Sequence, residues 1–369
     1  MKKNKKIAIV GAGNAGCVTA LHYDFYGRDK FDITIYHSPE DYLIERVGQG
    51  TLLHPITLIS QALNIDWYNN PIDATFKSGF LYEGWGQKKD KLFHPLTMNT
   101  ISMHFVPQKL SKAVLESGLF EVVEKTIDDP EKEIDADYIF DCRGRKNRDR
   151  DNYEPLINPL NSVLLYASPE KDVDLYYTRC VTTPNGWTFI IPNIDSVSYG
   201  YLYNNTITPK EEATQDFLKR FDLPETDGEL DFENYIAKNM FVGERTILNG
   251  NRCAFLEPLE STALDFYIKV CQVAWDHIVG GKEKSLCNKE IRLEMKKIQT
   301  FVLWHYKKGS KYKSPFWDYA QSLPFKTDIH FEETLERSKN VSFEIALRLM
   351  DDGYAQWDTR SFKIWNDNT

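Results

Sequence analysis

The chain has 369 residues, of which 42% are hydrophobic, and its formal net charge at pH 7 is −9. A chain of this length and composition can bury a substantial core, so we expect a folded body. Lysines and arginines are spread along an acidic chain, which excludes the concentrated basic surface of a nucleic-acid-binding protein. Six scattered cysteines without a C-x-x-C pair indicate buried thiols in a reducing compartment and no metal site.

The first residues are basic, but the segment "IAIVGAG" that follows is too short and too rich in glycine for a signal peptide or a membrane span. We therefore expect a cytoplasmic protein that does not associate with membranes. No repeat, low-complexity tract or evident linker interrupts the sequence, so residues 1–369 are expected to form a single compact body.

The amino-terminal part has the pattern of an α/β protein. A short apolar strand at 7–10 precedes a glycine turn and a helix that ends near Gly27, and a second strand, "FDITIYHS", follows. The stretch "ADYIFDCRGR", at 136–145, is another apolar strand ending in a polar turn, as expected at the carboxyl edge of a parallel sheet.

The middle and the carboxyl-terminal part have different patterns. Residues 163–203 contain four β-rich pieces separated by turn residues, which predicts a second, largely antiparallel sheet. Helical spacing of apolar residues returns at 211–221, after Thr262, and most strongly at 288–309. The sequence therefore predicts an α/β layer joined to an antiparallel sheet and a helical carboxyl-terminal region.

The glycine turn follows the pattern G-x-G-x-x-G at Gly11, Gly13 and Gly16, directly between the first strand and the first helix. Glycines at these positions allow the backbone to approach a pyrophosphate at the helix amino end, so the pattern favours a dinucleotide site over a plain βα turn. The second strand ends at His37, without the acidic residue that commonly holds a ribose. The turn alone therefore leaves NAD and FAD open.

Seven stretches carry a more specific pattern: "GAGNAG", "RVGQGTLLHPITLISQALNI", "ATFKSGFLYEGWG", "NGWTFIIP", "SYGYLYNN", "FLEPLESTA" and "IQTFVLWHYKKGSKYKSPFW". Taken together and in this order, they resemble the flavin-dependent halogenases of the tryptophan-halogenase type. The resemblance runs from Gly11 to Trp317 and covers most of the chain. It implies an FAD-binding Rossmann-like fold of the flavin monooxygenase type.

The resemblance also implies a reaction and its participants. FADH2 from a separate flavin reductase, dioxygen and a halide ion (chloride, bromide or iodide) would yield hypohalous acid. Lys77 would deliver the halogen to an electron-rich aromatic small molecule, and Glu260 would act as the catalytic carboxylate. The sequence around Lys77 is strand-like, and Glu260 lies between a proline and the helix-start residues Ser261 and Thr262, which fits a carboxylate at a helix amino end.

Further site residues follow from the same resemblance. Flavin contacts are implied for Gly11, Gly13, Asn14, Ala15, Gly16, His37, Val47, Gly48, Gln49, Gly50, Thr51, Asn251 and Leu256. Halide binding is implied for the backbone at Thr262 and Ala263, whose helix-start amides attract anions. The wall of the substrate passage is implied for His94, His104, Trp187, Phe189 and Pro192.

The sequence departs from the family pattern at Gln49, Phe189, Ala263 and the loop 250–254. Two alternatives therefore stay open: a flavin monooxygenase that hydroxylates or epoxidises its substrate directly, and a degenerate flavin-binding protein. The tail "DDGYAQWDTRSFKIWNDN" either caps the active site or joins the subunits of a homo-oligomer. We expect the FAD-binding module to comprise mainly residues 1–88, 120–160 and 240–285. The substrate side is expected to comprise mainly residues 89–119, 161–239 and 286–369.

Overall fold

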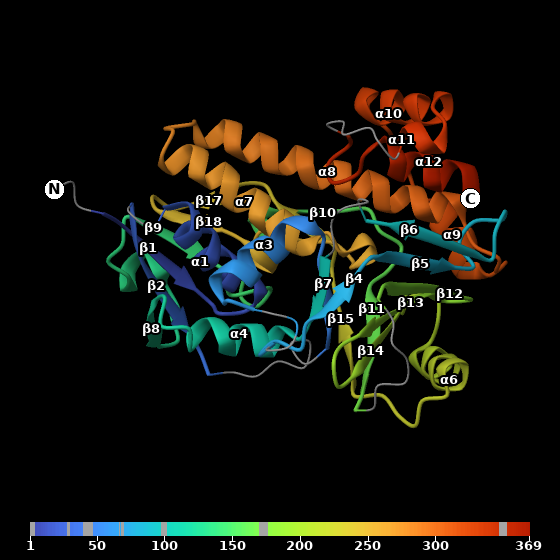
Figure 1. Ribbon diagram of the computed structural model, residues 1–369, viewed down its shortest axis with the longest axis horizontal. Coiled ribbons are helices and arrows are strands. Elements are labelled where there is room, and N and C mark those ends of the chain that lie inside the picture. Colours follow the sequence, from blue (N-terminus) through green and yellow to red (C-terminus); the bar gives the residue numbers. More distant parts are fainter. Residues whose placement is uncertain are drawn as a thin grey trace.

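The structure is a computed structural model. It describes residues 4–27, 30–39, 47–65, 67, 70–96, 102–169, 176–346 and 353–369. In these ranges the chain forms two large sheets and two small ones, covered by helices (Figure 1).

The first large sheet has six strands in the order β17-β18-β9-β1-β2-β8. Their bounds are β1 Lys5–Val10, β2 Phe31–His37, β8 Glu121–Glu124, β9 Tyr138–Asp141, β17 Phe241–Val242 and β18 Thr246–Leu248. β1 pairs in parallel with β2 and β9, and helix α1 (Asn14–Gly27) connects β1 to β2. The last four residues of β1 are all buried, as in a parallel sheet covered on both faces. The predicted parallel α/β layer is confirmed.

The second large sheet has seven strands in the order β15-β11-β14-β13-β12-β5-β6. Their bounds are β5 Gly79–Glu83, β6 Lys91–Pro95, β11 Ser162–Ser168, β12 Thr178–Thr183, β13 Gly186–Pro192, β14 Val197–Tyr203 and β15 Gly228–Asp231. Neighbouring strands are antiparallel except β12 and β5. The antiparallel sheet expected for 163–203 is therefore confirmed, and it continues through β5 into the β5–β6 hairpin.

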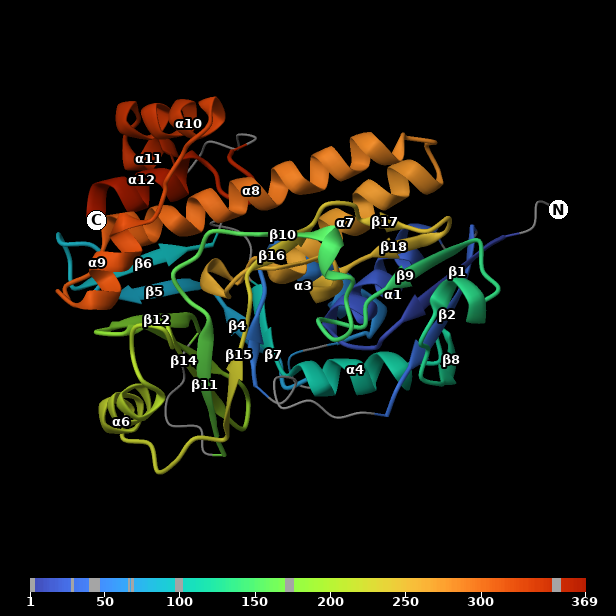
Figure 2. The same ribbon diagram turned by 180° about the vertical axis from the view of Figure 1, so that it is seen from behind.

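Two three-stranded sheets lie between the large ones (Figures 1 and 2). One has the order β3-β7-β4, with β3 Gln49–Gly50, β4 Thr75–Lys77 and β7 Ser102–Phe105. The other has the order β10-β16-β19, with β10 Tyr153–Pro155, β16 Tyr235–Ala237 and β19 Ala254–Phe255. In the first, β7 lies between the segment around Gly50 and the strand that ends at Lys77, because both of these pair with β7.

The helices of the described residues cover these sheets. Their bounds, α1 apart, are α3 Leu53–Ala62, α4 Pro107–Leu115, α5 Pro130–Glu133, α6 Lys210–Phe221, α7 Ala263–Ile278, α8 Lys284–Lys308, α9 Pro315–Ser322, α10 Ile329–Asn340, α11 Phe343–Ala346 and α12 Thr359–Asn368. The long helix α8 spans from the six-stranded sheet to the seven-stranded one (Figures 1 and 2). No helix in the described ranges is both long enough and apolar enough to span a membrane.

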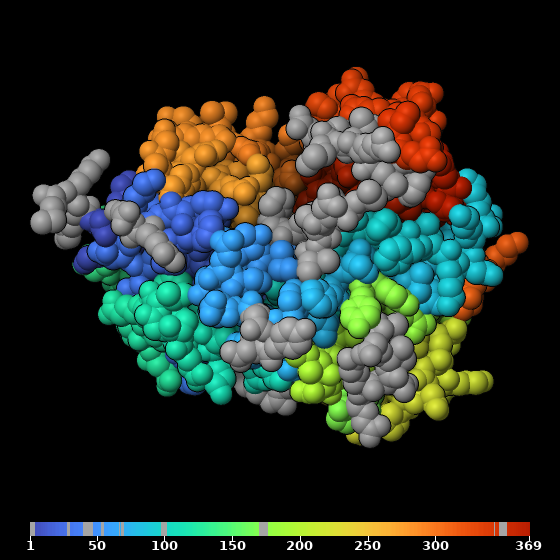
Figure 3. Space-filling view, viewed as in Figure 1, coloured from blue at the N-terminus to red at the C-terminus, as the bar shows by residue number. Residues whose placement is uncertain are grey.

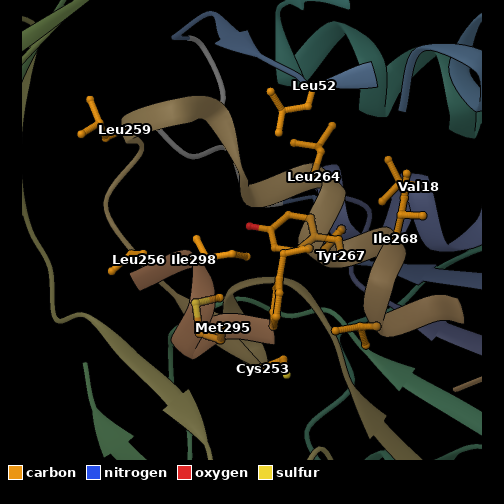
Figure 4. Close-up of a cluster of buried hydrophobic side chains, with 14 of the residues drawn as sticks. Val18, Leu52, Cys253, Leu256, Leu259, Leu264, Tyr267, Ile268, Met295 and Ile298 are labelled. Carbon is orange, nitrogen blue, oxygen red and sulfur yellow. The ribbon is translucent and has the colours of Figure 1, made fainter. Parts of the chain in front are cut away.

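One hydrophobic cluster joins the two large sheets and the helices. Figure 4 shows part of it, where Tyr267 of α7 lies among Met295 and Ile298 of α8 and Leu256 of the loop before α7. Leu256 and Leu259 are buried, and each directly precedes one of the two glutamates, Glu257 and Glu260, so they anchor the segment that carries them. Packing of this kind fixes the position of α7 relative to the strands.

The carboxyl-terminal helix α12 packs against β6 and α10. In the space-filling view its red surface lies between the orange helices and the cyan β5–β6 hairpin (Figure 3). Its residues are mostly buried, and Lys88 beside the hairpin donates a hydrogen bond to the backbone oxygen of Asn366. The tail is thus part of the folded body of the chain.

Candidate active site

The turn "EPLES" leads into α7 with an unusual backbone. Glu260 and Ser261 have φ angles of 69° and 54°, in the left-handed region that side chains other than glycine rarely adopt. Each such residue costs about 1–3 kcal/mol and persists only where its surroundings hold it. The turn therefore depends on its contacts.

Glu257 supplies those contacts. Its buried carboxylate accepts hydrogen bonds from Trp187 Nε1 at 3.2 Å, the Tyr306 hydroxyl at 2.7 Å, Asn158 Nδ2 at 3.3 Å and the backbone N–H of Leu259 at 3.3 Å. Burial raises its pKa to about 7, although these donors act in the opposite direction. The first glutamate of the motif thus ties the turn to β13 and α8.

Lys77 ends strand β4 with its ammonium group fully buried. Nζ donates hydrogen bonds of 2.9 Å to the backbone oxygen of Thr51 and to the hydroxyl of Ser261. It also lies 3.9 Å from the centroid of the Phe80 ring. Burial lowers the pKa of Lys77 to about 7, against the opposing effect of nearby acidic groups that include Glu260.

The segment around Gly50 packs directly on Lys77. A Cβ added at Gly50 would lie 3.0 Å from Lys77 Nζ and 3.0 Å from the Ser261 hydroxyl, so a side chain at this position would crowd both groups. Val47 and Thr51 on either side are buried, and the Gly48 N–H donates to a serine hydroxyl on β14. This segment, expected to lie against a flavin, is thus adjacent to the lysine.

Glu260 is fully buried and surrounded by hydrogen-bond donors. Oε1 accepts from the Tyr82 hydroxyl and from His305 Nε2 at 2.9 Å, and it lies 3.6 Å from His94 Nδ1. Oε2 accepts from Trp357 Nε1 at 3.0 Å. Burial would by itself raise the pKa of Glu260, but the charge of His94 and the hydrogen bond from His305 hold it well below its usual range.

A cavity of about 370 Å³ opens beside this carboxylate. Its inner wall holds Phe80, His94 and Glu260, and its outer walls come from α7, α8 and the tail. The outer part is lined by Asp265, Ile268, Lys269, Gln272, Glu294, Gly353, Ala355, Gln356, Trp357, Asp358, Arg360 and Ser361. Lys77 is not among the described lining residues; its ammonium lies behind the Phe80 ring.

Of the two histidines expected at the substrate passage, only His94 faces this cavity. His104 is buried with Nδ1 3.3 Å from the Thr75 hydroxyl and Nε2 2.9 Å from the Thr178 hydroxyl. Burial and the charge of Lys77 hold its pKa well below the usual range, so its neutral form is favoured. His104 thus packs beside Lys77.

The other expected passage residues lie on β13, outside the described lining of the cavity. Trp187 donates to Glu257 and the Tyr306 hydroxyl. Phe189 packs over Gly200, where an added Cβ would lie 2.0 Å from the ring. The carbonyl of Pro192 accepts a hydrogen bond of 2.7 Å from Thr75. These residues support the site from behind the strand that bears Lys77.

Thr262 and Ala263, the expected halide residues, stand at the start of α7. Thr262 is the N-cap residue, and its carbonyl accepts from Phe266 N at 3.0 Å and from Gln356 Nε2 at 3.4 Å. Ala263 is the first residue of the helix. Both follow Ser261, the partner of Lys77, so the helix start and the lysine are adjacent.

The glycine turn between β1 and α1 has the geometry of a dinucleotide site. Gly11 has a φ of 105°, and an added Cβ would lie 2.8 Å from the carbonyl oxygen of Cys142. At Gly16 an added Cβ would lie 1.8 Å from the carbonyl oxygen of Gly11, which excludes any side chain. Gly13 directly precedes α1, and His37 ends the neighbouring strand β2. The backbone is therefore open to a phosphate at the helix amino end.

The neighbours of this turn also suit a polar ligand. Asn14 Nδ2 donates a hydrogen bond of 2.6 Å to Gln49 Oε1, which links the glycine turn to the segment packed on Lys77. Asn14 Oδ1 is buried without a hydrogen-bond partner among the described residues. Gly250 approaches Ala15 so closely that an added Cβ would lie 2.3 Å from the Ala15 Cβ. An unpaired buried acceptor beside a glycine turn fits a bound cofactor such as FAD.

The loop after Gly250 differs from the family pattern and is held internally. The Asn251 side chain accepts from the Tyr267 hydroxyl at 2.8 Å, and its carbonyl accepts from the Tyr235 hydroxyl at 2.5 Å. Arg252 Nε lies 3.0 Å from Asp141 Oδ2 at the end of β9. Arg252 thus binds the loop to the six-stranded sheet, and Asn251 binds it to α7 and β16. In the described ranges, no group of three or more His, Cys, Asp or Glu is arranged to hold a metal ion.

Sequence reasoning missed three groups around Glu260. His305 lies in the stretch "FVLWHY", where the helical pattern predicts internal packing or hydrogen bonding, but in the structure it contacts Glu260. The signal that could have indicated this is its place in the last of the seven family-like stretches. Tyr82 follows the lysine motif on β5, and no spacing rule connects it with residue 260. Trp357 belongs to the tail, for which capping was one of two expectations. Its contact with Glu260 places the tail over the site.

Comparisons with known proteins agree with this arrangement. The family model described as "Tryptophan halogenase" matches residues 6–113 and 102–362. Tryptophan 7-halogenase RebH of Lentzea aerocolonigenes is 26% identical over 204 residues, which cover 50% of this chain and 38% of that protein. Tryptophan 6-halogenase ThaL of Streptomyces albogriseolus is 23% identical over 254 residues, which cover 64% of this chain and 47% of that protein. The alignments thus span less than half of these relatives.

Solved structures show the same fold at low identity. The structure of MibH, a "lathipeptide tryptophan 5-halogenase", matches with a TM-score of 0.80 at 16% identity. The match covers 99% of this chain and 86% of the MibH chain. Xcc4156, a flavin-dependent halogenase from Xanthomonas campestris, has a TM-score of 0.79 at 17% identity, covering 98% and 88%. The fold is therefore that of the flavin-dependent halogenases. Because the family model matches most of the length of this chain, the chain belongs to the tryptophan halogenase family.

Proposed function

We propose that this protein is an FADH2-dependent halogenase that transfers an electrophilic halogen to an electron-rich aromatic small molecule. The observation that carries the proposal is the hydrogen bond between Lys77 Nζ and the hydroxyl of Ser261, the residue that follows Glu260, whose carboxylate lines the cavity. Direct transfer of an oxygen atom to a substrate needs neither a buried lysine nor a buried carboxylate at this place. Their proximity favours the halogenase over the monooxygenase.

The cofactor and the lysine have separate tasks in this proposal. FAD, when bound in reduced form, supplies the reaction of dioxygen with a halide ion that makes hypohalous acid. The glycine turn and Asn14 would hold it, and the helix start at Thr262 and Ala263 would attract the halide. Lys77 would hold hypohalous acid by a hydrogen bond from its ammonium, or take up the halogen when neutral. Its pKa of about 7 keeps both forms accessible near neutral pH.

Glu260 completes the transfer at the cavity. As the ring carbon bonds to the halogen, the halogen–oxygen bond of hypohalous acid breaks, and the hydroxide leaves as water with a proton from the Lys77 ammonium. The ring carbon then loses its own proton. An ionised carboxylate within hydrogen-bond reach accepts that proton. Three donors keep Glu260 ionised, and an intermediate of this kind is acidic enough to give its proton to a weak base.

The cavity indicates the size of the substrate. About 370 Å³ holds a ring system of one or two rings, and Phe80, His94 and Trp357 offer it aromatic surfaces. The polar outer part, with Lys269, Gln272 and others, would contact a substituent. We expect a separate flavin reductase to supply FADH2.

The test is a mass-spectrometric assay of the purified chain with FAD, a flavin reductase and NADH. Chloride, bromide and iodide are supplied in turn with a panel of phenols and indoles, and catalase removes free hydrogen peroxide. A product that gains halogen supports the proposal and identifies the halide. A product that gains an oxygen atom instead would establish the monooxygenase, and FAD binding without any product would favour the degenerate flavin-binding protein.

A further inference from the structure

His305 lies on α8 with both ring nitrogens directed at oxygen atoms. Nδ1 lies 2.8 Å from the backbone oxygen of Phe301, and Nε2 lies 2.9 Å from Glu260 Oε1. The imidazole is fully buried. A carbonyl oxygen can only accept a hydrogen bond, so Nδ1 carries a hydrogen.

The second contact then determines the charge of the ring. A neutral His305 with its hydrogen on Nδ1 would direct the lone pair of Nε2 at Glu260. Glu260 also accepts hydrogen bonds from the Tyr82 hydroxyl and Trp357 Nε1, which favour its ionised form, and an ionised carboxylate only accepts. Two acceptors do not approach to 2.9 Å without a hydrogen between them. The geometry points to an imidazolium–carboxylate pair in which His305 carries hydrogens on both ring nitrogens and donates one of them to Glu260.

The pair divides the two oxygens of Glu260 between two tasks. Oε1 accepts from Tyr82 and His305, which occupy both of its lone pairs. Oε2 accepts from Trp357, and no second donor among the described residues reaches it. Glu260 and Trp357 both line the cavity. On the proposed function, Oε2 is therefore the atom that accepts the ring proton, and His305 is a positioning residue that fixes the opposite oxygen.

The remaining charged groups around the pair come from three strands and the turn itself. His94 of β6 lies 3.6 Å from Glu260 Oε1, and its Nε2 lies 3.0 Å from the Ser361 hydroxyl. Lys77 of β4 and Tyr82 of β5 interact electrostatically with Glu260, and Glu257 acts on Tyr82. None of these groups offers His305 an alternative acceptor within hydrogen-bond distance among the described residues.

Aromatic rings separate the pair from solvent. The Trp365 ring centroid lies 3.9 Å from that of His305, and the rings of Phe301 and Trp85 follow at 5.1 and 6.0 Å. A buried ion pair is stable only when its lone pairs and hydrogens are all used, and here every hydrogen of the imidazolium has an acceptor. The pair is thus enclosed, except at the Oε2 edge.

The direct test is nitrogen NMR of the full chain, without substrate, with ¹⁵N in its eight histidines. At about pH 8, where an unperturbed histidine with a pKa of about 6.5 is neutral, one ring should still show two protonated nitrogens. His305→Gln should remove that signal, and Glu260→Gln should convert it to the signal of a neutral ring. His330→Gln, at an exposed position of α10, is the control and should leave the signal of the doubly protonated ring in place. A neutral ring at His305 in the wild type would overturn the inference.

A second readout addresses the positioning role. His305→Gln keeps an amide donor but removes the positive charge, so the carboxylate is less stabilised and the pKa of Glu260 rises. The acid limb of the halogenation rate should shift to higher pH, with about a tenfold lower rate on that limb for a shift of one pH unit. An unchanged limb would refute the role. Absence of product from the wild type would refute the proposed function and leave the NMR result as the test of the pair.

Discussion

The ammonium nitrogen of Lys77 donates a hydrogen bond of 2.9 Å to the hydroxyl of Ser261, and this contact joins the two ends of the candidate site. Lys77 comes from β4 and Ser261 from the strained turn before α7, and the two residues are 184 positions apart. Because Glu257 holds that turn, the relative placement of Lys77 and Glu260 depends on a residue that touches neither reacting group.

The two glutamates of the turn should respond differently to the same substitution. Glu260→Gln removes the proton acceptor, so the halogenation rate should fall by about 10²–10⁴-fold while the folded structure remains. Glu257→Gln preserves the shape of the side chain but weakens its hydrogen bonds to the turn. It should therefore lower the free energy of unfolding by about 1–3 kcal/mol at a pH where residue 257 is uncharged in both the wild type and the variant. Rate measurements and chemical denaturation distinguish the two. Equal loss of rate with unchanged stability would contradict the division of roles.

The stability of the wild type should depend on pH through Glu257. Its folded pKa of about 7 lies above the model value of 4.5, so the folded state binds more protons between these two values. The free energy of unfolding of the wild type should therefore fall, relative to Glu257→Gln, as the pH rises from 4.5 to 7. Denaturation at several pH values checks this, with Glu225→Gln, at an exposed position after α6, as the control. A constant difference would show that the carboxylate is ionised throughout.

Lys77 should have the opposite effect at higher pH. Its folded pKa of about 7 lies below the model value of 10.5, so the unfolded state binds more protons between them. Relative to Lys77→Met, the wild type should gain stability as the pH rises from 7 to 10.5. The matched control is Lys91→Met on β6, whose side chain is 65% exposed and should show no such trend. If the wild type gained stability with pH relative to Lys91→Met as well as to Lys77→Met, the cause would be a general effect of charge and not the burial of Lys77.

Trp357 tests the capping role of the tail. Its ring stacks on Phe301 with a centroid distance of 3.9 Å, and its Nε1 donates to Glu260. Trp357→Phe preserves the stacking surface and removes the donor, so it should cost about 1 kcal/mol of stability and change the rate more strongly than the affinity for the aromatic substrate. Steady-state kinetics separate kcat from KM. A change confined to KM would mean that Trp357 only contacts the substrate.

Local patterns were sufficient for most of the fold. The buried apolar strand at 7–10, the glycine turn and the helix to Gly27 follow from spacing that neighbouring residues dictate, and β1 and α1 have nearly these bounds. The helix at 288–309 is likewise a local signal, although α8 begins earlier, at Lys284. Strand pairing across the chain is different, because β5 joins β12 through contacts nearly 100 residues apart that no local period indicates.

The site was predictable only where a motif carried it. Lys77 and Glu260 come from the family resemblance, and their contact through Ser261 could not be read from spacing because it is made between distant segments. Trp187 is expected to face the passage, and the structure adds that its N–H donates a hydrogen bond to Glu257. Successive residues of a strand point to opposite faces of the sheet, and a contact with a distant segment, here the turn that contains Glu257, determines how the side chain is used.

The central claim is that Lys77 transfers the halogen after halide oxidation, and the most direct measurement compares both steps in wild type and Lys77→Met. Hypohalous acid is trapped with a chlorination-sensitive diketone, and aryl halide is measured by mass spectrometry in parallel, with Lys91→Met as the control. We predict that Lys77→Met still oxidises halide but forms aryl halide at least about 100-fold more slowly. Equal aryl halogenation by the wild type and Lys77→Met would show that hypohalous acid reaches the substrate through solution, and would contradict the account.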